Sequence, residues 1–226
     1  MNAPVKAAKA TKWPKYTDKL GNVVPSVTTI IGRFKDSGAL LYWANKMGRE
    51  GKTLDEARQA EMTAGTLAHT LVEMSLGGDE NPSVDGQASP EVVARAKNAF
   101  DAYRKWAKMT AVEIRYSEVP LVSERYKFGG RLDAVGLIGN ELALCDWKAA
   151  NGVYVDYTFQ LAAYGLLWEE AYPDHPLTSG YHLLRFAKEE GDFSHHHFPK
   201  LEKEAISFLK MRELFDLVKD CEKRVK

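Results

Sequence analysis

Two aspartates and a lysine on neighbouring predicted strands are the residues best placed to do chemistry. Gly139-Asn140 separates two apolar segments and favours a two-residue β-hairpin turn. Continuing the register that this turn imposes sets Asp133 directly opposite Asp146. Because side chains alternate between the two faces of a strand, Arg131 and Lys148 then share a face with both aspartates. The pattern therefore predicts four charged side chains clustered on one face of a hairpin.

Two interpretations of this cluster remain open at this point. Directly opposed carboxylates repel each other, and the surrounding strand residues are apolar, so their charge needs compensation. One compensation is structural, with diagonal ion pairs from Asp133 to Lys148 and from Asp146 to Arg131. The other is a divalent cation held by carboxylate oxygens, with Lys148 close to a bound water or phosphate. Spacing alone favours neither.

Four short motifs follow one another along the chain around this hairpin. They are GTLAHTLVE at residues 65–73, GGRLD at 129–133, DWK at 146–148 and QLAAY at 160–164. In this order they resemble the PD-(D/E)XK nuclease superfamily, specifically its RecB-like exonuclease branch. The segment PSVTTI at residues 25–30, followed by a helical pattern that contains Trp43, further resembles the subgroup of the mitochondrial genome maintenance exonuclease and related phage exonucleases.

The resemblance implies a metal site and a fold. Asp133 and Asp146 would ligate Mg²⁺ or Mn²⁺, together with His69 and the main-chain carbonyl of Trp147. The expected fold is α/β, with a mixed central β-sheet flanked by helices, as in the restriction-endonuclease-like PD-(D/E)XK core, and with a helical N-terminal part. Glu73 lies one helical turn beyond His69 and is expected to support the metal site or to add a further ligand.

The resemblance also implies catalytic roles around the metal. Lys148 would orient or deprotonate the attacking water and stabilise the charge of the phosphorane. Gln160 and Tyr164, four residues apart on one helical face, match a QxxxY motif and would support the site or contact DNA. Together these groups would supply positioning and electrostatic stabilisation for attack on a phosphodiester.

Two features of the branch are absent from this sequence. Its iron–sulfur members carry four cysteines, whereas this chain has two, Cys145 and Cys221, so no iron–sulfur cluster is expected. The phosphate-binding pattern GxxxxGK[ST] of helicases does not occur. Any unwinding must therefore come from a partner protein, or the substrate must already be single-stranded.

The elements that would position these residues can be outlined from periodicity and punctuation. We expect a flexible basic arm at residues 1–21 and a single domain at 22–226. Within it, a helical part covers about 36–108, a catalytic sheet about 112–198 and a C-terminal helix about 201–225. Thr53 and Glu56 form a capping-box pattern at one helix start, and Gly77-Gly78 is typical of a helix end.

Composition restricts the class of protein. The chain has 226 residues, of which 45% are hydrophobic and 27% charged, and a formal net charge of zero. These values are typical of a globular domain and exclude a disordered chain or a disulfide scaffold. The charge is uneven, because residues 1–60 hold 11 Lys and Arg against 5 Asp and Glu. We expect a bacterial or phage-infected host cytoplasm as the location, and no membrane partner.

Several other residues invite a functional interpretation. His195-His196-His197 suggests a metal site, but on a strand its members alternate faces and cannot all reach one ion. Tyr154 and Tyr157 could stack on bases of a single strand, as could Tyr164, whereas Trp168 is expected in the core. Cys145 should point into the packing layer opposite Asp146 and act as a small core residue.

These observations lead to one main hypothesis and two alternatives. The main hypothesis is a metal-dependent DNA exonuclease that acts at single-stranded ends or flaps in replication, repair or recombination, with a replication or recombination protein as a partner. An endonuclease specific for a structure or a sequence could use the same core. A DNA-binding module without turnover is the third hypothesis, although such a module has little need for opposed acids.

Overall fold

The hairpin predicted around Gly139-Asn140 lies at the centre of the fold. In the computed structural model, which describes residues 15–35, 38–150, 152–189 and 191–225, β4 (Phe128–Ile138) pairs antiparallel with β5 (Glu141–Ala149). Ala134 lies opposite Cys145, as the predicted register requires. Gly139 and Asn140 have φ values of 58° and 71°. A type I′ turn needs a left-handed conformation at both positions, which glycine and asparagine tolerate well.

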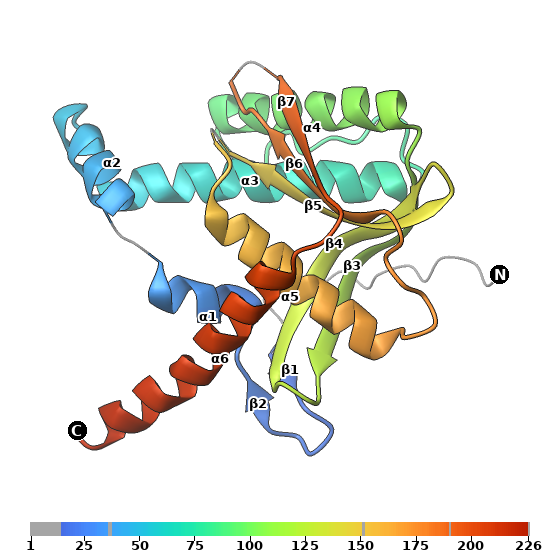
Figure 1. The fold of residues 1–226 in the computed structure, drawn as a ribbon. Helices are drawn as coiled ribbons and strands as arrows, with labels where there is room; N and C mark the ends of the chain where they lie inside the picture. The colour runs from blue at the N-terminus through green and yellow to red at the C-terminus, as the bar shows by residue number, and fades with distance from the viewer. Residues whose placement is uncertain (1–14, 36–37, 151, 190, 226) are drawn as a thin grey trace.

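Three further strands extend this hairpin into a mixed sheet of order β3-β4-β5-β6-β7 (Figure 1). β3 (Glu113–Ser123) and β7 (Phe193–Phe198) form its edges and pair antiparallel with their neighbours. β6 (Gly180–Phe186) runs parallel to β5, and the connection between them contains α5 (Val155–Ala171). The predicted class, an α/β fold with a mixed central sheet, is confirmed.

Helices cover both faces of the sheet (Figure 1). α3 (Leu54–Leu76) and α4 (Pro90–Thr110) pack on one face. α5, α1 (Val27–Phe34) and α6 (Glu202–Lys223) lie on the other. Alternation along β5 serves both layers, because Cys145 and Trp147 belong to the core beneath α3 and α4, and Leu144 belongs to the opposite core. The predicted core role of Cys145 is confirmed, and burial raises the pKa of its thiol.

The helices begin and end where their sequence signals predict. The Thr53 hydroxyl accepts a hydrogen bond from the backbone N–H of Glu56, whose carboxylate accepts one from the backbone N–H of Thr53, which completes the capping box of α3. α3 ends at Leu76, directly before Gly77. The Ser26 hydroxyl caps α1 by accepting a hydrogen bond from Thr29 N–H. This capping gives α3 a defined start and places His69 in its fifth turn.

Two smaller features complete the described chain. β1 (Tyr16–Thr17) and β2 (Val23–Val24) form a two-stranded sheet, so the part of the predicted basic arm that the structure describes includes a strand, and residues 1–14 lie outside the described residues. α2 (Gly38–Arg49) projects from the body of the molecule and packs against α3 (Figure 1).

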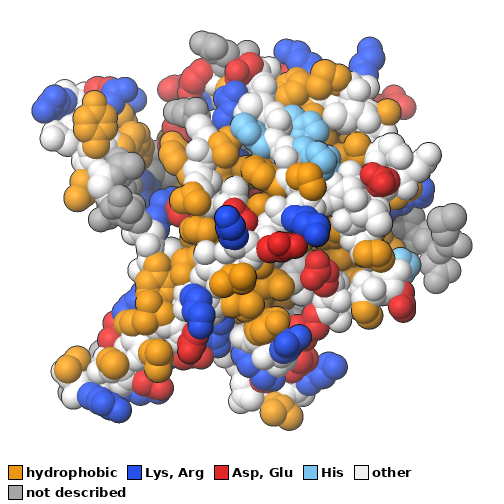
Figure 2. Space-filling view, in the orientation of Figure 1, with side chains coloured by type: hydrophobic (Ala, Val, Ile, Leu, Met, Phe, Trp, Pro, Cys, Tyr) orange, Lys and Arg blue, Asp and Glu red, His pale blue; other side chains and the backbone are white. Residues whose placement is uncertain are grey.

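Acidic and basic side chains are interspersed on the face of the molecule seen in Figure 2. None of the helices in the described residues is both long and apolar enough to cross a membrane.

Candidate metal centre and active site

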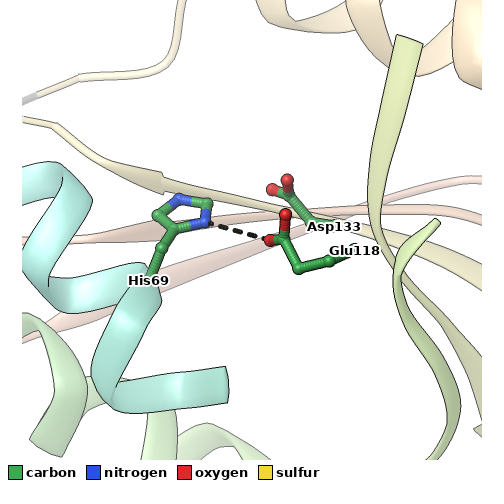
Figure 3. Close-up of side chains that lie close together, drawn as sticks. All are labelled: His69, Glu118 and Asp133. Carbon is green, nitrogen blue, oxygen red and sulfur yellow. Dashed lines mark ion pairs between the residues drawn. The ribbon is translucent and has the colours of Figure 1, made fainter. Parts of the chain in front are cut away.

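A histidine and two carboxylates from three different elements converge near the middle of strands β3 and β4. His69 comes from α3, Glu118 from β3 and Asp133 from β4, and their candidate ligand atoms lie within 4.8 Å of one another (Figure 3). His69 Nδ1 is 3.9 Å from Glu118 Oε1. Glu118 and Asp133 are 7% and 9% exposed. The sequence predicted two members of this group, His69 and Asp133, and missed the third.

The register of the β3–β4 pair explains how Glu118 reaches this group. Val119 lies opposite Leu132 and Ser117 opposite Ala134, so Glu118 is level with Asp133. Glu118 has a φ of 53°, a left-handed value that L-residues rarely adopt. A conformation of this kind costs on the order of 1 kcal/mol or more and persists only where the surrounding structure imposes it. The strained residue is the one whose carboxylate faces His69 and Asp133.

Asp146 and Lys148 form a second, adjoining group on β5. Asp146 is fully buried, and Lys148 Nζ is 2.5 Å from its Oδ2 atom. Gln160 Nε2 on α5 lies 3.4 Å from Asp146 Oδ1 and donates a hydrogen bond of 2.8 Å to the Tyr164 hydroxyl. The helical spacing of Gln160 and Tyr164 therefore lets one amide connect a buried acid to a buried phenol.

Trp147 connects the two groups through its main chain. Its backbone N–H donates a hydrogen bond of 2.9 Å to Asp133 Oδ2. Its indole ring packs in the core beneath α3 and α4, edge-on against Tyr103 and Trp106. The side chain thus anchors β5 while the backbone holds the Asp133 carboxylate. Ligation of a metal by the Trp147 carbonyl remains a prediction.

The ion pairs at the site differ from the diagonal lattice that the sequence allowed. Arg131 Nε pairs with Glu118 Oε2 at 2.6 Å, and Lys148 pairs with Asp146 along its own strand. The diagonal ion pairs were expected from the two strands of the hairpin alone. In the structure a third strand, β3, places the Glu118 carboxylate next to Arg131. The cluster therefore contains one more acid than the sequence analysis counted.

Burial and mutual repulsion shift the proton affinities of this cluster. Burial raises the pKa of Asp146 to about 7, although Lys148 opposes the shift. Burial, followed by repulsion from Glu118, also raises the pKa of Glu73. Burial lowers the pKa of His69, but the nearby Asp133 and Glu118 carboxylates raise it by more, so the net shift is upward. The shifts reflect the burial of the site and, for His69 and Glu73, the carboxylates that surround them.

The donor set and its charge fit a hard divalent cation. Two buried oxygens, Glu118 Oε2 and Asp146 Oδ2, have no well-oriented hydrogen bond among the described residues, although each lies near a cationic side chain. Carboxylate oxygens with one imidazole suit Mg²⁺ or Mn²⁺. Asp133 and Glu118 favour a protonated His69, but an imidazole that ligates a metal must be neutral. A bound cation would therefore replace the proton on His69.

The remaining sequence predictions fall outside this group. His195 and His197 lie on the face of β7 next to His182, and His196 points to the other face, as alternation requires. Trp168 is 1% exposed and packs in the core below β4, as expected. Tyr164 is also buried, so it supports the site from beneath and is not exposed to stack on a base.

Glu118 is the residue that the sequence analysis missed. It stands between a strand with alternating apolar residues and the Val119-Pro120 dipeptide, where no short motif marks it. A register for β3 against β4 would have found it opposite Asp133, but the four residues between these strands, 124–127, do not form a two-residue turn that fixes such a register from sequence alone.

Comparison with known proteins identifies related sequences and folds. The family model of the PD-(D/E)XK nuclease superfamily matches residues 31–224 of the chain. No curated protein matches the chain. A solved structure from Eubacterium rectale, provisionally named as an exonuclease, has 14% identity and a TM-score of 0.45; the match covers 68% of this chain and 66% of that chain, just under two thirds. An alkaline exonuclease from Laribacter hongkongensis, LHK-Exo, has 14% identity and a TM-score of 0.33, with 71% of this chain and 85% of that chain covered.

Proposed function

Because the chain belongs to the PD-(D/E)XK nuclease superfamily, we propose that it is a metal-dependent DNA exonuclease that hydrolyses phosphodiester bonds at single-stranded ends or flaps. The observation that carries the proposal is the convergence of His69, Glu118 and Asp133 beside the buried Asp146–Lys148 pair. A buried excess of carboxylates next to a lysine is costly for stability and is suited to holding a cation against a phosphate.

The proposed metal ligands are Asp133, Asp146, His69 and the Trp147 carbonyl, to which the structure adds Glu118. When bound, Mg²⁺ or Mn²⁺ would polarise the phosphodiester and lower the pKa of the attacking water. The chain's own contribution is to hold the ligands in place: Trp147 N–H orients the Asp133 carboxylate, and Gln160 lies against Asp146.

Lys148 is proposed to act on the phosphate as a charged group. Burial lowers the pKa of its ammonium, but Asp146 and Asp133 raise it by more, so the net shift is upward. A lysine with a raised pKa is a poor base and a good electrostatic partner. Lys148 therefore orients the water by donating a hydrogen bond and stabilises the negative charge that develops on the phosphorane.

The exonucleolytic mode is supported by sequence. The segment PSVTTI at residues 25–30 and the Gln160–Tyr164 pair resemble the exonuclease branch, and in the structure the former contains the Ser26 cap and the first turn of α1. No contact among the described residues favours an endonuclease, and the experiment below distinguishes the two modes.

Cleavage of end-labelled linear single-stranded DNA, beside circular single-stranded and duplex DNA, tests the proposal. Each substrate is incubated with Mg²⁺, Mn²⁺ or EDTA. We expect metal-dependent loss of the linear single strand alone and a fall of about 10²-fold or more with Lys148→Ala or Asp133→Asn. Lys210→Ala, which changes an exposed lysine on α6, is the control and should retain activity. A loss of less than tenfold in both site variants would contradict the proposed site, and cutting of circles would indicate an endonuclease.

A further inference from the structure

An exposed aromatic surface lies at the start of α5, next to the proposed active site. Tyr154 is the residue directly before the helix and is 49% exposed. Its neighbours Val153 and Val155 are 37% and 62% exposed. Three consecutive apolar or aromatic side chains at the surface are unusual for a helix start, where short polar caps are favoured. Tyr154 makes no side-chain capping hydrogen bond, so capping does not explain it.

A second tyrosine joins Tyr154 to the catalytic lysine. The rings of Tyr154 and Tyr157 meet edge to face, with centroids 5.5 Å apart and an interplanar angle of 82°. Lys148 Nζ lies 5.5 Å from the centroid of the Tyr157 ring. Tyr157 is partly buried, whereas Tyr154 is open to solvent. The exposed ring is therefore one aromatic neighbour away from the ammonium that would face the scissile phosphate.

The charge around Tyr154 is also suited to a nucleic-acid strand. Lys35, at the end of α1, has its Nζ 5.9 Å from the Tyr154 ring centroid. The same Nζ pairs with Asp156 at 2.9 Å, which offsets the acid in the first turn of α5. The Lys35 side chain is 54% exposed. An exposed aromatic ring close to an accessible lysine is the combination that single-strand-binding proteins use for base stacking beside a phosphate contact.

We propose that Tyr154 is a base-stacking residue, supported edge-on by Tyr157, and that Lys35 contacts a phosphate of the same strand. The inference rests on the proposed nuclease function and refines its substrate: the nucleotide next to the scissile bond must be unpaired. A base inside a duplex has both faces covered by its neighbours, whereas an unpaired base can offer one face to the Tyr154 ring.

Steady-state cleavage of a single-stranded oligonucleotide by variants at position 154 tests this directly. Tyr154→Ala should raise KM by about five- to a hundredfold, as expected for loss of one stacked base, with kcat close to wild type. Tyr154→Phe keeps the flat ring and should retain the wild-type KM, and Tyr154→Leu, which keeps bulk without a ring, should resemble the alanine variant. Tyr126→Ala is the matched control, because Tyr126 also carries a cation over its ring, Arg125 at 5.0 Å, in the turn before β4. It should leave KM unchanged.

An abasic scan locates the stacked base. A single abasic site is moved stepwise from the end of the strand, and the wild type should show one position at which KM rises. Tyr154→Ala should be insensitive at that position. If the wild type cleaves DNA while Tyr154→Ala has a wild-type KM and a wild-type abasic profile, or if Tyr154→Leu matches Tyr154→Phe, the stacking inference is wrong and the nuclease proposal stands.

Binding separates failure of the two proposals in the remaining case. If the wild type cleaves no DNA with either metal, the proposed function fails. The stacking residue is then read from quenching of a 2-aminopurine strand in Ca²⁺, which Tyr154→Ala should abolish and Tyr154→Phe should preserve. Absence of quenching in the wild type overturns this inference as well.

Discussion

Replacement of Lys148 by Met, alone and together with Asp146→Asn, measures the energetics of the buried pair at the proposed active site. Lys148 Nζ is 2.5 Å from the Asp146 carboxylate, whose residue has no exposed surface, and the Lys148 side chain is 16% exposed. The single substitution leaves a buried carboxylate without its cation. The double substitution removes both charges and leaves two uncharged side chains of similar size.

The structure indicates the size of each effect. Breaking a buried ion pair by removing one partner costs about 3–5 kcal/mol, whereas replacing both partners is often neutral or stabilising. Because Lys148 retains some contact with solvent, we expect the lower end of that range, about 3 kcal/mol, for Lys148→Met at alkaline pH. The double variant should be within about 1 kcal/mol of the wild type or more stable than it. The two substitutions are therefore expected to be strongly non-additive.

The cost should also depend on pH in a defined direction. Burial raises the pKa of Asp146 to about 7, above the value of about 3.9 for an unfolded aspartate. An acid whose pKa is raised by folding contributes stability that is fully present below pH 3.9 and is lost as the pH rises through about 7. Without Lys148 the pKa of Asp146 should rise further. The difference between wild type and Lys148→Met should therefore be small at pH 5.5, where Asp146 is protonated in both, and large at pH 8.5.

Urea unfolding in EDTA at pH 5.5 and 8.5, followed by far-ultraviolet circular dichroism, measures these differences for the wild type, Lys148→Met, Asp146→Asn and the double variant. Equal m values are the control for a two-state comparison. A cost for Lys148→Met that is the same at both pH values, or additive effects in the double variant, would refute the assignment of Asp146 as a strained buried acid.

Three further outcomes follow from other contacts. Mn²⁺ at about 100 times its Kd should stabilise the wild type by about 2.7 kcal/mol, or roughly 5–10 °C in Tm. In a thermal scan, Glu118→Gln should reduce this rise in Tm. A rise as large as that of the wild type would show that Glu118 is not a metal ligand. Gly130→Ala should cost about 1–3 kcal/mol in urea unfolding, because its Cβ would lie 2.7 Å from Tyr164 Cε1, and an unchanged midpoint would contradict the packing described. Burial and the neighbouring histidines of β7 lower the pKa of His182 to about 4, so the stability due to neutral His182 is present above pH 6.5 and lost as the pH falls towards 4. Between pH 6.5 and 4, the free energy of unfolding of His182→Phe should therefore fall by on the order of 2 kcal/mol less than that of the wild type. Parallel pH profiles of the two proteins would argue against a buried neutral imidazole.

The parts of the fold that depend on local chemistry could be predicted from sequence. The Gly139-Asn140 turn sets the β4–β5 register, because only a narrow set of residues accepts the left-handed values that it needs. The Thr53 capping box sets the start of α3 in the same way. These signals act within a few residues, so tertiary context has little opportunity to override them.

The parts that depend on long-range pairing could not be predicted. Glu118 enters the site because β3 pairs with β4 across a loop that does not fix the register, and because its own φ of 53° is imposed by the tertiary structure. The pairing of Arg131 with Glu118 follows from the same strand. The edge-to-face contact of Tyr154 with Tyr157 likewise depends on where α5 packs on the sheet. Sequence identified the acids of one hairpin, and the third strand changed their partners.

The energetics of Asp146 argue that this position is selected for chemistry rather than for packing. An asparagine would fill the same volume and could still meet the Gln160 amide, without the cost of a charge at 0% exposure. The carboxylate instead holds Lys148 and lies beside a histidine and two further acids that also gain from a cation. A buried carboxylate that destabilises the metal-free fold at neutral pH, next to other potential metal ligands, is best explained by a bound state in which a divalent cation removes the penalty. On this reasoning the double variant Asp146→Asn/Lys148→Met should be at least as stable as the wild type without metal at pH 8 while its cleavage of DNA is abolished, and a double variant that lost both would show that the carboxylate has a structural role instead.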